Sequence, residues 1–370
     1  MSDNRKRYRA IHMKLMQLHN YPTGRVAQRI AVLAGYISGI VGSRKIHNRE
    51  VAKHSGLRAT VESRIKRIGR WYQNEAVGYE VEYLPYVRPL LEELAHYPLA
   101  LAMDATGVGR NCMALMVHVI YERRAIPICW TVIGQPKGHS PAEVHIQLLE
   151  QVRSILPDTC EVVFLGDGEF DSVELQTYLC DLPNWDYVSR TAKSTQLTVE
   201  GEIISYAEQG VFLQPGVCLS LPDVLFSQQL FGPVHAVLHW GKQYEEPLYL
   251  VTSFELAEEA CHWYSLRMRI ETFFSDQKSR GFGLDKSHIS EPARLSRLLI
   301  AACLAYIWMI YLGVQSHVRD MVPILHRADR CDLSLFQLGL DYLHYFLEEE
   351  LDIDVSFSLP TQFLYQKCVR

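Results

Sequence analysis

Residues 99–104 read Leu-Ala-Leu-Ala-Met-Asp, and residues 162–167 read Val-Val-Phe-Leu-Gly-Asp. Each stretch is a short apolar run that ends in an aspartate. An uninterrupted apolar run of this length is typical of a central strand that is covered on both faces of its sheet. The sequence therefore predicts two buried strands on which Asp104 and Asp167 mark the ends. Taken singly, each acid also fits an ordinary turn after a strand.

The residues around these runs complete a mixed α/β pattern. Two further β-rich runs follow the first strand, and helical and strand patterns then alternate. The strands are expected at 112–121, 124–133 and 185–189, and the helices at 141–155 and 172–179. We therefore expect an α/β fold with a mixed sheet that is parallel in part.

Changes in composition divide the chain into five regions. The stretch 194–255 is rich in Val, Leu and Thr, has Gly and Pro turns, and predicts an all-β insertion into the α/β core. Residues 1–95 are expected to be helical and basic. The core is expected in two parts, 96–193 and 256–320, on either side of the insertion at 194–255, and a C-terminal helical region is expected at 321–370.

Charge is distributed unevenly along the chain. Residues 1–75 hold sixteen Lys+Arg and four Asp+Glu, whereas the other 295 residues hold 21 and 38. This asymmetry predicts a basic binding arm on an acidic body. Residues 49–70 resemble a helix-turn-helix with Gly56 at the turn, and Arg58, Arg64 and Arg67 are candidates for DNA contacts. A solvated basic helix in a small bundle is the alternative.

Cysteines and one apolar segment bear on the compartment. No two of the nine cysteines lie within ten residues of each other, so no ribbon or disulfide framework is visible, and we expect a reducing cytoplasm. Residues 298–314 are uncharged and close to the lower limit for a membrane-spanning helix. We expect this segment to be a core helix, no second span elsewhere, and no membrane partner.

A further stretch carries polar chemistry, Tyr264-Ser-Leu-Arg-Met-Arg-Ile-Glu-Thr-Phe-Phe-Ser-Asp-Gln-Lys278. On one continuous helix, Tyr264, Arg267, Glu271 and Lys278 fall within a stripe of about 60°. One carboxylate among cations and a phenol suits a phosphate-rich ligand, with Glu271 as a metal ligand. A surface helix with ordinary salt bridges is the alternative.

Asp104, Asp167 and Glu271 together are a candidate three-carboxylate cage. Mg²⁺ and Mn²⁺ prefer such oxygen ligands. Two such ions about 4 Å apart activate a water or a 3′-hydroxyl and stabilise the leaving oxygen of a phosphodiester.

The spacing Tyr-x2-Arg-x3-Glu-x6-Lys from Tyr264 to Lys278 resembles the signature of DDE transposases of the insertion-sequence-four family. Asp167-Gly168-Glu169-Phe170 resembles the context of that family's second acid, and Asp104-Ala105-Thr106 resembles that of its first. The order and separations also fit, with 62 residues between the two aspartates and 103 before Glu271. The resemblance covers residues 96–315 and implies an RNase H-like fold interrupted by a β insertion.

The resemblance also implies an activity. Asp104, Asp167 and Glu271 would bind two Mg²⁺ (or Mn²⁺) ions, while Tyr264, Arg267 and Lys278 would hold DNA phosphates. The enzyme would be the transposase of a bacterial insertion sequence, cleaving element ends and joining them to target DNA. Its partners would be the double-stranded terminal inverted repeats and target DNA, bound by a homodimer in the nucleoid. Trp240 is a candidate to stabilise a flipped base, although a core or hairpin tryptophan is favoured.

Two rival interpretations stay open. One is an RNase H-like metal-dependent nuclease that cuts without joining. The other is a transposase-derived DNA-binding protein with an idle cage. The three intact acids argue against an idle cage, and metal-dependent strand joining separates all three.

Overall fold

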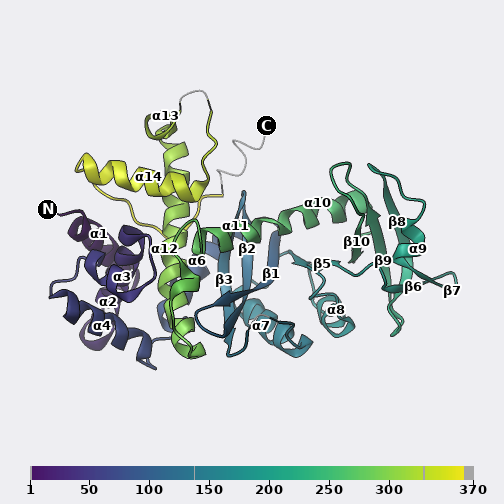
Figure 1. The fold of residues 1–370 in the computed structure, drawn as a ribbon, viewed down its shortest axis with the longest axis horizontal. Coiled ribbons are helices and arrows are strands. Elements are labelled where there is room, and N and C mark those ends of the chain that lie inside the picture. Colours follow the sequence, from purple (N-terminus) through teal and green to yellow (C-terminus); the bar gives the residue numbers. More distant parts are fainter. Residues whose placement is uncertain (1, 137, 328–329, 362–370) are drawn as a thin grey trace.

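The computed structural model describes residues 2–361 except residues 137 and 328–329, with helices toward both ends and strands between them (Figure 1). The helices are α1 (Asp3–Leu18), α2 (Gly24–Ser43), α3 (Asn48–His54), α4 (Val61–Gln73), α5 (Tyr79–Glu82), α6 (Leu84–Leu94), α7 (Ala142–Ile155), α8 (Val173–Cys180), α9 (Tyr206–Gly210), α10 (Ala257–Arg267), α11 (Arg269–Gln277), the 3₁₀ helix η1 (Leu284–Lys286), α12 (Pro292–Val318), α13 (Val322–Leu325) and α14 (Leu335–Glu348). The strands are β1 (Leu99–Val108), β2 (Cys112–Tyr121), β3 (Arg124–Ile133), β4 (Val162–Gly166), β5 (Trp185–Arg190), β6 (Gln196–Val199), β7 (Glu202–Ser205), β8 (Cys218–Phe226), β9 (Phe231–His239) and β10 (Leu248–Thr252).

The ten strands form one sheet in the order β3-β2-β1-β4-β5-β10-β9-β8-β6-β7. β1, β2 and β3 pair antiparallel, whereas β1, β4 and β5 run parallel. The arrangement is the RNase H-like mixed sheet that the resemblance implies, so the predicted α/β fold class is confirmed.

The central strands are buried on both faces. Every residue of β4 and nearly every residue of β1 and β2 is buried. Helices α10 and α11 contact β1, while α7 contacts β2 and β3 and α8 contacts β5. Burial on both faces explains why these strands have continuous apolar runs rather than alternating ones.

β1 is longer than its apolar run predicts. It continues through Val108, so Asp104 lies inside the strand and the expectation that it ends the strand was wrong. The parallel pairing of β1 with β4 does stop at Ala102 and Leu165, while the antiparallel pairing with β2 continues to Val108. Asp104 therefore lies two residues beyond the last β1–β4 partners. The strand itself continues there, because β2 still pairs with it.

The insertion at 194–255 differs from the prediction in two ways. It contains helix α9, which Ser205 and Glu208 begin with a reciprocal capping box, so an all-β insertion was wrong. Its strand β10 also pairs with β5 of the core. The insertion is therefore an extension of the central sheet, rather than a separate β unit.

Two helices, α2 and α12, are long and apolar enough to cross a membrane by length and composition alone. In α12, 89% of the most apolar window is buried inside the protein, against 61% in α2. α12 packs against α2, α14 and β3, as a core helix does. The expectation that the rest of the chain offers no second candidate span was wrong by length and composition, because α2 passes the same test.

The described elements fall within the predicted regions, although the division itself stays a prediction. Helices α1 to α6 lie in 1–95, and α10 to α12 lie in 256–320. The C-terminal region contains α13 and α14, followed by irregular chain from 351 to 360. Residues 328–329 and 362–370 of this predicted region lie outside the described residues.

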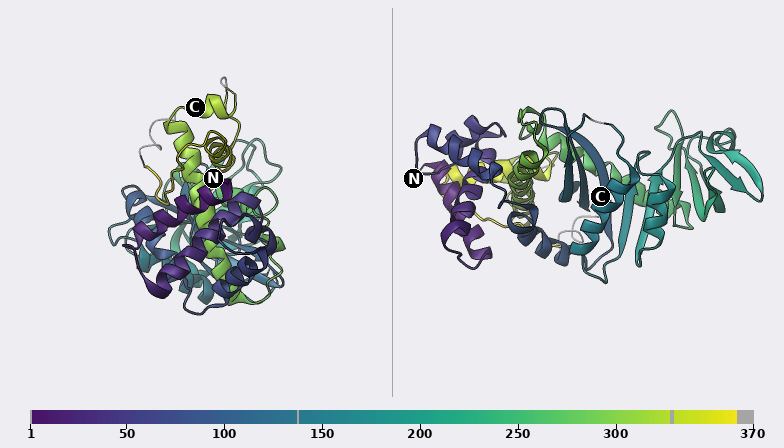
Figure 2. Two further views of the ribbon diagram at one scale, coloured as in Figure 1. Left: turned by 90° about the vertical axis from the view of Figure 1, so that its left-hand side faces the viewer. Right: turned by 90° about the horizontal axis from the view of Figure 1, so that it is seen from below.

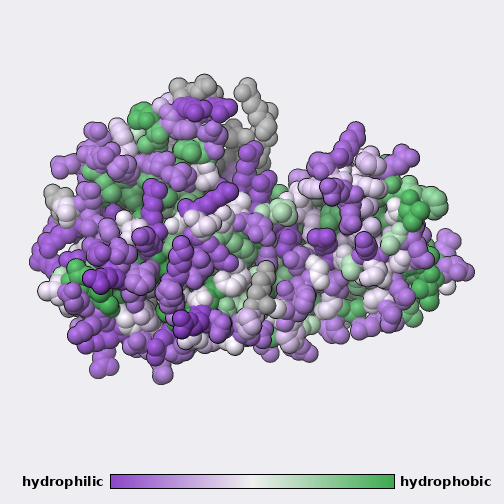
Figure 3. Space-filling view, viewed as in Figure 1, coloured by the Kyte–Doolittle hydropathy of each residue, from purple (hydrophilic) through white to green (hydrophobic). Residues whose placement is uncertain are grey.

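The molecule is elongated. Figures 1 and 2 show the N-terminal helices at one end, α12 beside them, and the insertion at the other end. Most of the surface in Figure 3 is hydrophilic, with an apolar area at the insertion end. Ile203, Val211 and Phe212 of the insertion are among the exposed apolar side chains.

Candidate active site

Asp104 and Asp167 are held together by one arginine. Nη2 of Arg267, at the end of α10, lies 3.1 Å from Oδ2 of Asp104 and 2.7 Å from Oδ2 of Asp167. Each aspartate follows the last β1–β4 partners, Ala102 and Leu165, by two residues. Parallel pairing therefore brings the two carboxylates to the same level, although 62 residues separate them in the sequence.

The remaining oxygen of each aspartate accepts a backbone hydrogen bond. Oδ1 of Asp104 accepts from the N–H of Ala105 at 2.7 Å, and Oδ1 of Asp167 accepts from the N–H of Glu169 at 3.0 Å. The carbonyl of Asp167 also accepts from the N–H of Phe170, whose ring is buried. Both carboxylates are thus oriented by the backbone on one side and by Arg267 on the other.

The pKa of Asp104 shows how the charges act on one another. Burial raises this pKa to about 6, the positive charge of Arg267 opposes the rise, and the charges of Asp167 and Glu271 add to it. Glu271 itself is exposed. We name Asp104, Asp167 and Glu271 the carboxylate cluster, because the negative charges of Asp167 and Glu271 both act on Asp104.

The stretch from Tyr264 to Lys278 is two helices, so the prediction of one continuous helix was wrong. α10 ends at Arg267 and α11 begins at Arg269, with Met268 between them. Glu271 lies in the first turn of α11, and Lys278 follows its last residue. The interruption turns Arg267 toward the aspartates while Nζ of Lys278 donates to the hydroxyl of Thr106 on β1.

Tyr264 belongs to the same neighbourhood. It is buried on α10, and burial raises its pKa while the charges of Arg267 and Arg190 oppose the rise. Trp240 follows β9 in the insertion, where its indole N–H donates to the carbonyl of Tyr244 at 2.8 Å. This bond gives Trp240 a role in holding a turn, in keeping with the favoured interpretation of a hairpin tryptophan.

Sequence reasoning missed a histidine beside the cluster. Nε2 of His145, buried on α7, lies 3.8 Å from Oε1 of Glu169, which also accepts the N–H of Ser140 at 3.1 Å. The His145 ring packs on Phe170 with centroids 4.7 Å apart. The signal in the sequence was a histidine on the apolar face of the predicted helix 141–155.

The residues present fit a divalent cation. Oδ2 atoms of Asp104 and Asp167 converge on a single nitrogen of Arg267, so a cationic group already occupies the space between them. Glu271 adds a third, solvent-accessible carboxylate. Hard divalent cations prefer such an all-oxygen donor set.

The region of the predicted helix-turn-helix contains α3 and α4 with a turn between them, and the assignment of the motif stays a prediction. The side chain of Thr60 caps α4 by accepting from the N–H of Ser63, and Gly56 makes the turn with φ of 70°. A Cβ on Gly56 would lie 2.2 Å from the carbonyl oxygen of Asn4 in α1. The turn therefore requires glycine for its backbone angle and for its contact with α1.

The three basic candidates of this region have different surroundings. Arg58 is exposed, and Arg67 lines a pocket with it. Arg64 is partly buried, and its Nη1 donates to the carbonyl of Ala52 at 3.2 Å. We name as the basic N-terminal surface the arginines that line two pockets sharing Arg67, namely Arg5, Arg9, Arg25, Arg29, Arg58, Arg67 and Arg70.

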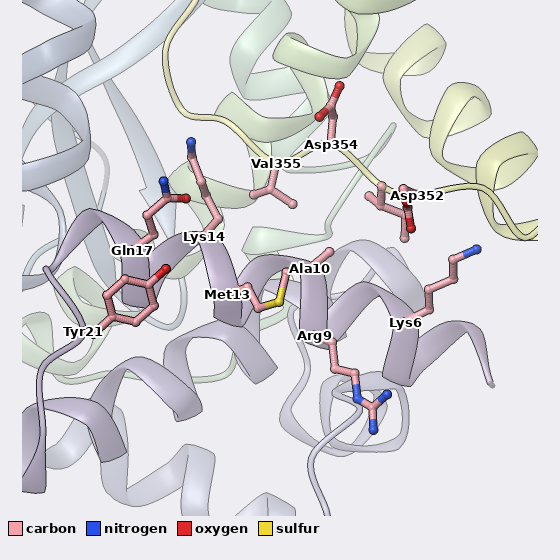
Figure 4. A pocket seen from close by; sticks show the side chains of 11 residues that line it. Lys6, Arg9, Ala10, Met13, Lys14, Gln17, Tyr21, Asp352, Asp354 and Val355 are labelled. Atoms are coloured by element: carbon pink, nitrogen blue, oxygen red, sulfur yellow. The ribbon is translucent and has the colours of Figure 1, made fainter.

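Another side of α1 faces acidic chain. Lys6 and Lys14 line a pocket whose other wall includes Asp352 and Asp354 of the C-terminal segment (Figure 4). In the same view the guanidinium of Arg9 extends away from that segment. The positive charge of α1 is therefore divided between an internal acidic neighbour and the basic N-terminal surface.

The family model described as transposase DDE domain matches residues 98–308, more than half of the chain. The chain belongs to this family of DDE transposases, and it is an enzyme of DNA cleavage and strand transfer. Such enzymes use a divalent metal. The prediction of a DDE transposase is confirmed at this level.

Among solved structures, the chain is similar to the piggyBac transposase synaptic complex with hairpin DNA, at 11% identity over 97% of this chain and 81% of that one, with a TM-score of 0.44. It is also similar to the catalytic domain of human endonuclease V, at 16% identity over 61% of this chain and 84% of that one, with a TM-score of 0.27. No curated protein matches.

Proposed function

We propose that this DDE transposase serves a bacterial insertion sequence and resembles the insertion-sequence-four family. The observation that carries the proposal is the contact of Arg267 with Asp104 and Asp167, two aspartates on or beside adjacent parallel strands. Glu271 follows Arg267 by four residues. The same Arg267 and Glu271 belong to the spacing Tyr264-x2-Arg267-x3-Glu271-x6-Lys278.

In this proposal the carboxylate cluster holds Mg²⁺ or Mn²⁺, with two ions at work. The bound metal supplies an activated water or 3′-hydroxyl and stabilises the leaving oxygen. Asp104 and Asp167 orient their oxygens through β1, β4 and their backbone hydrogen bonds, and Glu271 contributes from the first turn of α11. Arg267, which contacts both Oδ2 atoms in the structure, would have to release them for a metal ion to bind there.

Arg267, Lys278 and Tyr264 then contact DNA phosphates. Arg267 offers a planar fork that suits a phosphate once it leaves the aspartates. Lys278 is already anchored on β1 through Thr106, beside Asp104 in sequence. This placement holds positive charge next to the position of the scissile phosphate, and it contributes to in-line geometry and charge stabilisation.

The basic N-terminal surface binds the terminal inverted repeats of the element. Exposed Arg58 and the neighbouring Arg67 neutralise phosphates, and α4 is positioned as the second helix of a helix-turn-helix. Arg64 donates a hydrogen bond to α3, so it stabilises the contact between α3 and α4. Two element ends require two such surfaces, so the proposed assembly is a homodimer on DNA in the cytoplasmic nucleoid. Trp240 stays a weaker candidate for a flipped base.

The test uses a labelled DNA end taken from the flanks of the gene's own locus. Wild type, Glu271→Gln and the control Glu259→Gln, an exposed acid on α10, are compared with Mg²⁺ and with chelator. Joined product that requires metal and Glu271, and that Glu259→Gln still forms, supports the proposal. Cutting without joining indicates the nuclease. Retarded DNA without either reaction, unchanged in Glu271→Gln, indicates a DNA-binding protein with an idle cluster.

A further inference from the structure

Three soft side chains meet where the insertion contacts α10. Cys218 of β8 and His239 of β9 are cross-strand partners, and Cys261 lies in the second turn of α10. One ligand atom from each of these residues lies within 4.8 Å of the others. We name Cys218, His239 and Cys261 the thiol–imidazole cluster.

The distance between the sulfurs fits a shared metal ion. Sγ of Cys218 lies 3.8 Å from Sγ of Cys261. Two sulfurs bound to one tetrahedral Zn²⁺ at about 2.3 Å each lie about 3.8 Å apart. A disulfide would need a separation of about 2 Å. The observed separation therefore matches two thiolates on one zinc ion.

The imidazole provides a second, independent observation. Nδ1 of His239 is buried, and it has no hydrogen-bond partner among the described residues. A buried nitrogen without a partner is costly, because it has lost water and gained nothing in return. A metal ion bound at this end of the ring would remove that cost.

We propose that Cys218, His239 and Cys261 bind one Zn²⁺ ion that fastens the insertion to α10. Binding forms two Zn–S bonds and one Zn–N bond, and the two thiol protons pass to solvent without any redox change. A water molecule takes the fourth position. Thiolates and an imidazole select zinc over Mg²⁺, whereas the carboxylate cluster does the opposite.

The place of the cluster gives the ion a structural role. α10 ends at Arg267, which joins the two aspartates, and α11 then begins with Glu271 in its first turn. An ion on Cys261 would fix the start of this helix against β8 and β9, because it links residues 43 positions apart. The zinc site thus steadies the element that delivers Arg267.

The test measures zinc in the full chain. The protein is purified under reducing conditions from zinc-supplemented cells, and its metal content is determined by mass spectrometry. We expect one zinc per chain in wild type and at least a tenfold lower content in Cys218→Ser, Cys261→Ser and His239→Asn. The matched control Cys180→Ser changes an exposed cysteine on α8 and keeps the zinc.

Two more measurements separate this site from its alternatives. Co²⁺ in place of zinc is expected to give thiolate charge-transfer bands and tetrahedral d–d bands, both lost in Cys261→Ser. Asp104→Asn, which alters the carboxylate cluster, is expected to keep the zinc. Circular dichroism confirms that each variant is folded, and chelation is expected to lower the Tm of wild type but not of Cys218→Ser.

Several results would overturn the proposal. One is wild type without zinc after supplementation under reduction, and another is zinc that persists in both serine variants. Loss of zinc in Asp104→Asn would place the ion at the carboxylate cluster instead. Oxidation of Cys218 and Cys261 to a disulfide in zinc-supplemented protein, without bound metal, would show a redox pair in place of a zinc site.

Discussion

The carboxylate cluster and the basic N-terminal surface differ in how far their charged side chains are buried and paired. At the cluster, Arg267 and Asp104 are almost fully buried and each is fixed by a partner. At the surface, Arg58 and Arg70 are exposed to solvent. Buried charges need their partners to offset lost hydration, whereas exposed charges do not. The comparison shows that the carboxylate cluster holds its charged groups in a fixed geometry. The basic N-terminal surface instead leaves its arginines able to adjust to a negatively charged partner.

The largest expected effect tests the fixed geometry of the cluster. Asp104→Asn keeps the size of the side chain and removes one charged oxygen ligand. We expect cleavage of element DNA to fall by at least about 10³-fold, which is about 4 kcal/mol of transition-state stabilisation. Single-turnover cleavage with Mg²⁺ measures this, with binding to the same DNA as the control. Cleavage within tenfold of wild type would remove Asp104 from the metal site.

The second prediction removes the cation between the aspartates. Arg267→Met leaves Asp104 and Asp167 facing each other, and we expect about 3 kcal/mol lower unfolding free energy in the absence of metal. Because a metal ion would replace the lost charge, Mg²⁺ should raise the Tm of this variant more than that of wild type. Arg269→Met, two residues further on, is the control. Equal Mg²⁺ responses in all three proteins would contradict the prediction.

The third prediction concerns the turn that positions the basic surface. Gly56→Ala places a Cβ against the carbonyl of Asn4 at a positive φ, so we expect about 2 kcal/mol lower unfolding free energy. Gly78→Ala is matched, because its backbone is extended and a Cβ there meets nothing within 4 Å. Urea unfolding measures both. Similar losses in the two variants would show that the turn imposes no special demand.

The smallest effects separate the arginines of the surface. Arg58→Ala and Arg67→Ala should each weaken DNA binding by about 1 kcal/mol and reduce the salt slope by about 1. Arg64→Ala should instead lower unfolding free energy by about 1 kcal/mol, because it loses the bond to Ala52. Titrations at several salt concentrations measure this, with Arg153→Ala as the exposed control. An unchanged salt slope in Arg67→Ala would show that Arg67 stabilises the fold and does not contact DNA phosphates.

Much of the core could be predicted because its signals are local. β2 and β3 have the predicted bounds, since their β-rich runs end at the turn of Glu122, which has φ of 54°. The break at Met268 has no such signal, because the residues on both sides continue a helical pattern. It follows from packing, since α10 lies mainly on β4, β5 and β8 while α11 lies mainly on β3.

The site was predictable in its residues and not in its contacts. The order of the acids and the spacing around Glu271 can be read along the chain, whereas the double contact of Arg267 depends on the register of β1 and β4. The thiol–imidazole cluster was not predicted from the sequence, because its contacts also depend on the fold. Cys218, His239 and Cys261 are more than twenty residues apart, and only the pairing of β8 with β9 and the packing of α10 unite them.

The joining of β10 to β5 has a mechanical consequence. Backbone hydrogen bonds run from β3 at one edge to β7 at the other, so the insertion continues the core sheet and is not a separate tethered module. The sheet therefore sets the separation between the outer strands of the insertion and Asp104. A duplex bound to those strands and to the carboxylate cluster at once would be cut at a distance from that contact set by the width of the sheet.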